Sequence, residues 1–284
     1  MRIVLTGGTG YIGSAVLRQL VGAGHAVSAL VRGDEAAAKV GKAGAEPVVG
    51  DLFDTGWVAE RFAAADGVVH LAATGGPDNP RFDAGIVAAA GQGLGGTAKP
   101  YVHTSGIWLW GDNPAITEEA PPAPPALTTW RLDVERQVLD GGLAATIVAP
   151  GIVYGHGGGI PAGVLAPARD EAGRVRLVGD GSQHWTTVHV EDVAALYRLV
   201  VERGEGLGRL IAASGANPAV REIGEAASGG AGVAAETVEE SRGRLGSLFA
   251  DALLLDQQAT GEKARSLGWS PSAPSLLDDL RAGR

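Results

Sequence analysis

The chain has 284 residues, enough to bury a sizeable core in one large domain or in a domain with a smaller lobe. Its net charge of −9 excludes a typical nucleic-acid partner, because phosphate contacts need clustered Lys and Arg side chains. The absence of cysteine excludes disulfides, thiolate catalysis and cysteine-ligated metals. We find no apolar run near the roughly 20 residues of a membrane span and no signal peptide, so we expect a cytoplasmic protein without a membrane partner.

The first fourteen residues, MRIVLTGGTGYIGS, predict a strand, a glycine turn and a helix. Residues 2–6 are mostly apolar, Gly7, Gly10 and Gly13 follow at a spacing of three, and 11–20 has the period of a helix. In this context the first glycine allows a tight turn, the second lets the backbone approach a pyrophosphate, and the third lets the helix pack on the strand. The N–H groups at the helix start then face the anion. The stretch therefore predicts a dinucleotide site.

Short apolar strands alternate with helices as far as residue 155. Strands are predicted at 26–31, 46–49, 68–72, 101–104 and 144–149, and helices at 35–44, 55–65 and 129–139. This alternation is typical of a doubly wound parallel α/β sheet, which binds ligands at the C-terminal ends of its strands. One more helix is expected within 75–96, and its several glycines predict an irregular C-terminal end.

The alternation is weaker after residue 155. We predict strands at 175–179, 183–190 and 209–212, a helix at 191–202, and mostly helices over 219–284 with a break at 268–271. The strand at 209–212 is expected to return to the main sheet. The predicted domains are therefore a dinucleotide-binding domain at 1–155, completed by 185–213, and a smaller substrate lobe at 156–184 and 214–284.

Five further segments carry a family resemblance. In chain order they read GDL (50–52), VHLAA (69–73), APGIVYG (149–155), VHVEDVA (188–194) and LGWSP (267–271). Together with TGGTGYIG they make the chain resemble the extended short-chain dehydrogenases/reductases, a superfamily that includes NAD(P)-dependent sugar epimerases and dehydratases. The resemblance covers nearly the whole chain, and it implies a Rossmann sheet with a smaller C-terminal substrate lobe.

The resemblance also implies a set of cofactor-binding residues. They are Gly7, Thr9, Gly10, Tyr11, Ile12, Gly13, Arg32, Asp51, Leu52, Leu71, Ala72, Ala73, Thr104, Arg131, Pro150, Gly151, Ile152 and Val153. NAD-binding relatives end the second strand with an acidic residue for the ribose 2′-hydroxyl, whereas this chain has Val31 and then Arg32. Arginine offers hydrogen-bond donors to a 2′-phosphate, so NADP is favoured. Asp34 and Glu35 keep NAD as the alternative.

The family's catalytic Tyr-x-x-x-Lys is changed in this chain. Aligning Glu135 with the family's Glu, four residues after its Lys, places Arg131 on the Lys and Leu127 on the Tyr. The chain contains no other Tyr-x-x-x-Lys, and this pattern resembles the atypical members that keep the cofactor fold. Ser105 lies one residue from the family's Ser/Thr position, which falls on Gly106.

Three residues are therefore the catalytic candidates: Ser105, Arg131 and Tyr154. Water or the substrate itself are the other sources of a proton. Arg131 is expected to bind the nicotinamide ribose or a substrate carboxylate, and the alternative is a surface ion pair with Glu135.

Aromatic residues and His156 are the substrate-side candidates. Trp108, Trp110 and Trp130 predict an aromatic wall over the nicotinamide, with plain core packing as the alternative. His156 follows a strand on the ligand side, and a mobile-loop position is its alternative. His70 and His103 are expected to be hydrogen-bonded core residues. The scattered His184 and His189 indicate no metal site.

The leading hypothesis is an NADP-dependent oxidoreductase that moves hydride between the nicotinamide and a small carbonyl-type substrate. The alternatives are a nucleotide-dependent epimerase or isomerase, and a non-catalytic NADP-binding regulator. Relatives often form homodimers through the helices after the fourth and fifth strands, and the glycines of 85–96 leave monomer and dimer both open.

Overall fold

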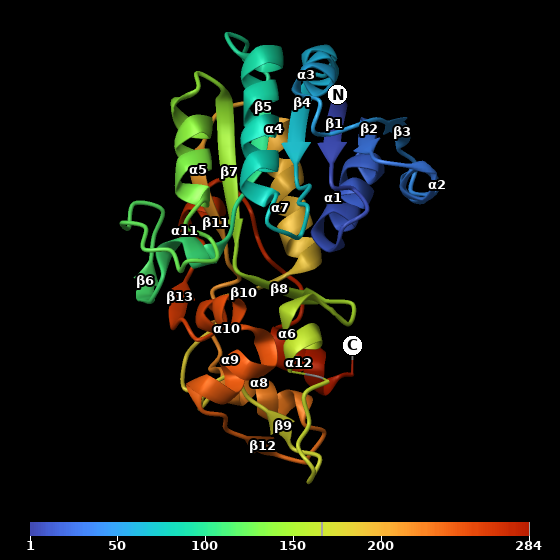
Figure 1. Cartoon of the computed structure of the whole chain (residues 1–284). Coiled ribbons are helices and arrows are strands. Elements are labelled where there is room, and N and C mark those ends of the chain that lie inside the picture. The colour runs from blue at the N-terminus through green and yellow to red at the C-terminus, as the bar shows by residue number, and fades with distance from the viewer. Residues whose placement is uncertain (166, 284) are drawn as a thin grey trace. The chain divides into compact units, whose positions relative to one another are not determined.

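A seven-stranded parallel sheet is the largest sheet in the computed structural model, which describes residues 1–165 and 167–283 (Figure 1). Its strand order is β11-β7-β5-β4-β1-β2-β3. The bounds are β1 Arg2–Thr6, β2 Ala26–Val31, β3 Glu46–Val49, β4 Gly67–His70, β5 Pro100–Thr104, β7 Ala144–Pro150 and β11 Gly208–Ala212. The order reverses between β1 and β4, which is where open α/β sheets bind ligands. The predicted doubly wound parallel sheet is confirmed, and 209–212 does return to it.

Helices cover both faces of this sheet. They are α1 Tyr11–Gly22, α2 Asp34–Lys42, α3 Thr55–Ala64, α4 Asn79–Leu94, α5 Arg131–Asp140 and α7 Val190–Arg203. Figure 1 shows α4 and α7 on opposite faces. The core beside α3, α4 and α5 is built from apolar side chains that these helices direct at the strands, among them Phe62, Ile86, Leu94 and Val138.

The helix α4 corrects one prediction, because it continues without a break through its glycines to Leu94. Its buried face includes Ile86, Ala89, Ala90 and Leu94, and this burial outweighs the low helix propensity of glycine. Gly93 has a packing role as well. A Cβ at Gly93 would lie 2.5 Å from the carbonyl oxygen of Ala59 in α3, so the close approach of the two helices requires a glycine there.

The chain divides into two compact units. The first comprises 1–105, 130–148 and 193–210, and the second comprises 106–129, 149–192 and 211–284. Segment 106–129, which we predicted within the dinucleotide-binding part, therefore packs with the second unit. This segment contains a short 3-10 helix, η1 Ile107–Trp110, whose Ile107, Leu109 and Trp110 are buried.

The second unit is built from short elements. Its helices are α6 Gly159–Val164, α8 Val220–Ala227, α9 Val238–Leu245, α10 Ser247–Leu253, α11 Glu262–Ser266 and α12 Leu276–Arg281. Its strands are β6 Asn113–Ile116, β8 Ile152–Gly155, β9 Val175–Arg176, β10 Thr187–His189, β12 Val233–Ala234 and β13 Gln257–Ala259. The strands predicted at 175–179 and 183–190 are thus shorter than expected. Gly179 and Gly181, which lie between β9 and β10, have positive φ angles of +63° and +79°, so the backbone there is not extended.

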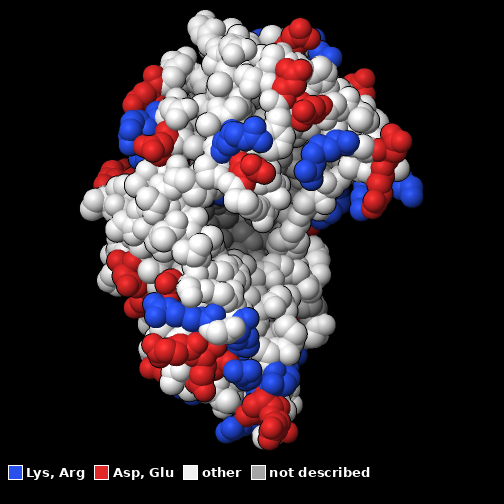
Figure 2. All heavy atoms as spheres, viewed as in Figure 1, with Lys and Arg blue, Asp and Glu red and all other residues white. Residues whose placement is uncertain are grey.

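Two further observations concern membrane-spanning helices and the distribution of surface charge. Among the described helices, none combines the length and the apolar character needed to cross a bilayer. On the face drawn in Figure 2, acidic and basic side chains are interspersed.

Candidate functional site

The glycine loop between β1 and α1 places each of its three glycines differently. Gly7 has a φ of +76°, and a Cβ there would lie 2.5 Å from the carbonyl carbon of Leu71. A Cβ at Gly13 would clash with the backbone of Gly7, so α1 packs directly on the loop. A Cβ at Gly10 would meet only the Gly7 carbonyl oxygen, at 3.3 Å. The fold itself therefore requires Gly7 and Gly13. Gly10, the N-cap of α1, keeps the helix start open to an anion.

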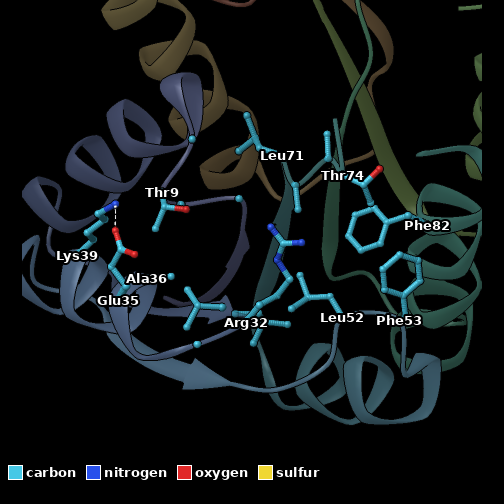
Figure 3. Close-up of a pocket in the computed structure, with 18 of the residues that line it drawn as sticks. Thr9, Arg32, Glu35, Ala36, Lys39, Leu52, Phe53, Leu71, Thr74 and Phe82 are labelled. Carbon is cyan, nitrogen blue, oxygen red and sulfur yellow. Dashed lines mark ion pairs between the residues drawn. The ribbon is translucent and has the colours of Figure 1, made fainter. Parts of the chain in front are cut away.

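A pocket of about 580 Å³ lies beside this loop, above the ends of β1, β2 and β4 (Figure 3). It is lined by the predicted residues Gly7, Thr9, Gly10, Arg32, Leu52, Leu71, Ala72 and Ala73. The lining residues that the sequence did not single out include Lys39, Phe53, Thr74 and Phe82. Phe53 directly follows the GDL segment (50–52), and this position could have identified it as a site residue from the sequence. The positions of Lys39 and Phe82 depend on how α2 and α4 face the sheet, and Thr74 lies in the loop before α4.

Charged and aromatic side chains lie at opposite ends of the pocket. Figure 3 shows Lys39 and Glu35 at one end, Phe53 and Phe82 at the other, and Arg32 pointing into the space between them. Lys39 Nζ lies 2.8 Å from Glu35 Oε1. This hydrogen bond and the charge of Lys39 hold the pKa of Glu35 below its usual value. The rings of Phe53 and Phe82 meet edge to face with centroids 5.1 Å apart.

The other predicted cofactor residues lie outside the pocket lining. Tyr11 and Ile12 belong to the first turn of α1, and Asp51 accepts a hydrogen bond from the Phe53 N–H at 2.9 Å. Thr104 Oγ1 donates to the His70 carbonyl at 2.6 Å. Four more predicted residues belong to the second unit: Pro150, Gly151, Ile152 and Val153. There Gly151 approaches Thr186 so closely that a Cβ would lie 2.6 Å from its carbonyl oxygen.

A buried polar chain runs beneath the ends of β1, β4 and β5. The N–H groups of Leu71 and Ala72 both donate to Thr6 Oγ1 at 3.3 Å, so the Thr6 hydroxyl hydrogen is left for His70 Nδ1 at 2.7 Å. We therefore assign the proton of His70 to Nε2, which donates to Asp83 Oδ1 at 3.0 Å. His70 and Asp83 are 1% and 5% exposed.

His103 approaches the same carboxylate from β5. Its Nε2 lies 4.0 Å from Asp83 Oδ2, and its Nδ1 lies 3.1 Å from the hydroxyl of Tyr101. Burial, followed by the nearby His70, lowers the pKa of His103 to about 3, so the ring is neutral at ordinary pH. Burial also raises the pKa of Tyr101 well above its usual value, and the charge of Asp83 adds to this rise. His70 and His103 are thus hydrogen-bonded core histidines, as predicted.

Arg131, the first residue of α5, reaches the end of β5. Its Nη1 donates to the Thr104 carbonyl at 3.1 Å and lies 3.9 Å from Asp83 Oδ2, and its guanidinium stacks on the Trp130 ring at 4.5 Å. Burial lowers the pKa of Arg131 from its usual value, which still leaves an arginine charged. The alternative of a surface pair with Glu135 is wrong. Glu135 is buried and accepts from Arg209 Nε at 2.6 Å, because β11 brings Arg209 beside α5.

Ser105 continues the pairing of β5 with β7. Its N–H donates to the Val148 carbonyl at 2.8 Å, and alternation along the strand gives its side chain the same sheet face as His103. The residue is 7% exposed, and its Oγ has no hydrogen-bond partner among the described residues. A buried hydroxyl without a partner is costly, which makes this Oγ a candidate ligand-binding group.

The other catalytic and substrate candidates are accounted for within their own units. Tyr154 is 3% exposed, and its hydroxyl donates to the Pro274 carbonyl at 2.7 Å. His156, with a φ of +53°, places Nε2 3.0 Å from Glu191 Oε1 and is largely exposed. These positions give Tyr154 a structural hydrogen bond and leave His156 accessible.

The tryptophans pack in separate cores. Trp130 packs on the core of the first unit, whereas Trp108 packs in that of the second and meets the Phe249 ring edge to face at 5.9 Å. Trp110 is 2% exposed, and its Nε1 donates to the Ala120 carbonyl. Trp110 therefore has the core role that was the alternative to an aromatic wall.

Comparison with known proteins identifies the family. The NAD(P)H-binding family matches residues 7–201. The chain belongs to this family. It is 32% identical to an uncharacterised protein of Saccharomyces cerevisiae over 99% of this chain and 98% of that protein. It is 31% identical to a 2-alkyl-3-oxoalkanoate reductase of Stenotrophomonas maltophilia over 71% of this chain and 66% of the relative. It is also 31% identical to a UDP-glucose 4-epimerase of Mycolicibacterium smegmatis over 95% and 94% of the two chains.

A solved structure agrees in fold. A human epimerase family protein with NADPH has a TM-score of 0.74, 19% identity, and coverage of 99% of this chain and 98% of that one. The resemblance to extended short-chain dehydrogenases/reductases is confirmed, and the chain is a member of an NAD(P)-binding oxidoreductase and epimerase-like family.

Proposed function

We propose that the protein is an NADP-dependent oxidoreductase that acts on a small carbonyl-type substrate without the family's usual tyrosine. The observation that carries the proposal is the buried, unpartnered Oγ of Ser105 at the end of β5. Arg131 donates to the carbonyl of Thr104, the residue before Ser105. The Ser105 hydroxyl and the Arg131 guanidinium are therefore both placed at the C-terminal end of β5. This pair suits the oxygen of a carbonyl group.

The site residues fit a nicotinamide dinucleotide. The glycine loop leaves the start of α1 open, and the adjoining pocket supplies apolar and polar walls for the adenosine half. When bound, the nicotinamide supplies or accepts the hydride. The Ser105 hydroxyl would then donate a hydrogen bond to the substrate oxygen, and Arg131 would donate hydrogen bonds to the nicotinamide ribose hydroxyls. Leu127 has no proton to give and the Tyr154 hydroxyl donates to the Pro274 carbonyl, so the exchanged proton would come from Ser105, from water or from the substrate itself.

The charges of the pocket favour NADP. Arg32 points into the pocket, and Lys39 lies at the same end as Glu35 (Figure 3); Asp34 is the other acidic residue of the lining. Of those acids, Glu35 is already paired with Lys39. Arg32 is thus the cation that can face a 2′-phosphate, and this is the reason for preferring NADP to NAD.

A substrate screen tests the function. NADPH oxidation is followed with ketones, aldehydes and 3-oxo acids, and products are identified. With the substrate found, Ser105→Ala is expected to lower turnover by about 10²-fold while NADPH affinity stays within about twofold. Ser266→Ala serves as the control, because its hydroxyl donates within α11 to the Lys263 carbonyl. Wild-type turnover in Ser105→Ala would place the chemistry on other residues.

A second candidate is an epimerase, favoured by the likeness to the UDP-glucose 4-epimerase over 95% of the chain. Epimerisation of a nucleotide sugar leaves no net oxidation of added cofactor, so sugar products must be analysed directly. Product from a nucleotide sugar without net NADPH consumption would support this candidate. Tight NADPH binding with no product from either class would instead support a non-catalytic regulator.

A further inference from the structure

One carboxylate, that of Asp83, lies between the two histidines and the candidate catalytic arginine. Its Oδ1 accepts from His70 Nε2 at 3.0 Å, while its Oδ2 faces Arg131 Nη1 at 3.9 Å and His103 Nε2 at 4.0 Å. We infer that Asp83 is a positioning residue that holds the Arg131 guanidinium toward the cofactor. The inference deepens the proposed function and rests on it for the role of Arg131.

The charge of Asp83 is not neutralised by the histidines. Thr6 donates to His70 Nδ1, so His70 Nε2 donates its hydrogen to the carboxylate. Burial would raise the pKa of Asp83, but the hydrogen bond from His70, followed by the proximity of His70, His103 and Arg131, lowers it below its usual value. Burial keeps His103 neutral at ordinary pH. Arg131 is therefore the permanent cation that faces an ionised Asp83.

Two other ionisable groups lie near Arg131, Glu135 and Tyr197. Glu135, on the same helix, accepts from Arg209 Nε through Oε2 at 2.6 Å, and its buried Oε1 has no hydrogen-bond partner among the described residues. Tyr197, on α7, shares a hydrogen bond of 2.8 Å with Thr104 Oγ1, and burial raises its pKa above the usual value, so it carries no charge. Asp83 is thus the anion that balances Arg131 on this side of the sheet.

The contacts of Arg131 restrain its plane and leave donors free for a ligand. The Thr104 carbonyl accepts one N–H of the guanidinium, the Trp130 ring covers one of its faces, and the Asp83 carboxylate attracts its Nη1 from 3.9 Å. Arginine has five N–H groups in a planar fork, so further donors are available for ribose hydroxyls. Without the carboxylate, the same cation would be largely buried and attracted toward Glu135 or toward solvent.

A double-mutant cycle on NADPH binding tests the inference. Asp83→Asn and Arg131→Gln are each expected to raise the Kd for NADPH roughly tenfold, as when one interaction with a charged group is lost. If Asp83 acts through Arg131, the double variant binds no more than about twofold more weakly than Arg131→Gln alone. Additive losses, about a hundredfold in the double variant, overturn the inference. Asp133→Asn, an exposed carboxylate on the same helix, is the control and keeps wild-type affinity.

The same cycle on denaturant unfolding separates the inference from the proposed function. Coupling between Asp83 and Arg131 in stability, with no NADPH binding by the wild type, rejects the proposed function but keeps the ion pair. NADPH binding without any coupling rejects the inference. If Asp83→Asn fails to fold, Asp83→Asn/Arg131→Gln must restore folding, since it leaves no unpaired cation; a double variant that also fails overturns the pairing.

Discussion

His103 shows how burial converts a titratable side chain into a fixed hydrogen-bonding group. The ring is 1% exposed, contacts Tyr101 through Nδ1, and has a pKa of about 3 against the usual 6.5. The folded protein therefore binds no proton at His103 over a pH range in which the unfolded chain does. Stability must depend on pH across that range.

We predict that the wild type loses stability as pH falls from about 7 toward 4, and that His103→Gln loses less. The unfolded chain gains a proton near 6.5, whereas folded His103 gains one only near 3, so acid favours unfolding throughout this window. His189, whose pKa is also lowered by burial, leaves the variant with a residual slope. Asp83 adds its own loss only at lower pH, because its folded pKa lies below its usual value of 3.8.

Thermal unfolding followed by circular dichroism at several pH values measures these slopes. Ser266→Ala is the control, since it changes no titratable group and its hydroxyl only donates to the Lys263 carbonyl, and it should keep the wild-type slope. Equal slopes in the wild type and in His103→Gln would mean that His103 accepts a proton in the folded protein.

At the scale of elements, α4 shows that glycines in one helix serve different purposes. A Cβ at Gly93 would lie 2.5 Å from the Ala59 carbonyl oxygen and 3.1 Å from the Ala63 nitrogen, both in α3. A Cβ at Gly91 would meet nothing within 4 Å. Gly93 is therefore needed by the contact of α3 with α4, whereas Gly91 only lowers helix propensity.

The two glycines give a matched pair of variants. Gly91→Ala is expected to stabilise the protein by about 0.5–1 kcal/mol, because alanine loses less backbone entropy in a helix. Gly93→Ala is expected to destabilise it by about 1–3 kcal/mol, because the new methyl group forces α3 and α4 apart. Urea unfolding measures both. A stabilising Gly93→Ala would show that the helices separate without cost.

The element bounds show where sequence reasoning succeeds. The strands at 2–6, 26–31 and 46–49 match β1, β2 and β3, because short apolar runs followed by turn residues leave little alternative in a parallel sheet. The helix α4 was misjudged because propensity is local, and the burial that overrides it comes from α3 and the sheet. In the second unit the strands are short and pair in two-stranded sheets. The alternation of apolar and polar residues along such short segments does not predict them.

At the scale of the whole molecule, the sequence predicts some residues of the candidate site and not others. Gly7, Gly10 and Arg32 were predicted, since a motif or a strand end fixes them, and all line the pocket. Asp83 was not predicted, because a single acid in an apolar helix has no signature until the fold places it beside His70 and Arg131. Site residues that belong to a motif can be predicted from the sequence. Whether a residue on a helix belongs to the site depends on which face of the helix packs on the sheet, and the sequence alone does not give this.

Cofactor binding connects the pocket to the stability of the whole chain, and it gives the last prediction. At about 100 times its Kd, NADPH should stabilise the wild type by about 2.7 kcal/mol. A charge-assisted contact between Arg32 and the 2′-phosphate contributes about 1.5–3 kcal/mol, so Arg32→Ala should weaken NADPH binding by at least about tenfold. The stabilisation at the same NADPH concentration then falls to about 1.4 kcal/mol or less.

NADH lacks the 2′-phosphate, so its smaller stabilising effect should be the same in the wild type and in Arg32→Ala. Lys42→Ala removes a cation from the end of α2, outside the residues that line the pocket, and should change neither response. Thermal unfolding of the three proteins with each cofactor makes the comparison. If NADH stabilises the wild type as much as NADPH does, Arg32 is a solvated surface residue, because a bound phosphate would have distinguished the two cofactors.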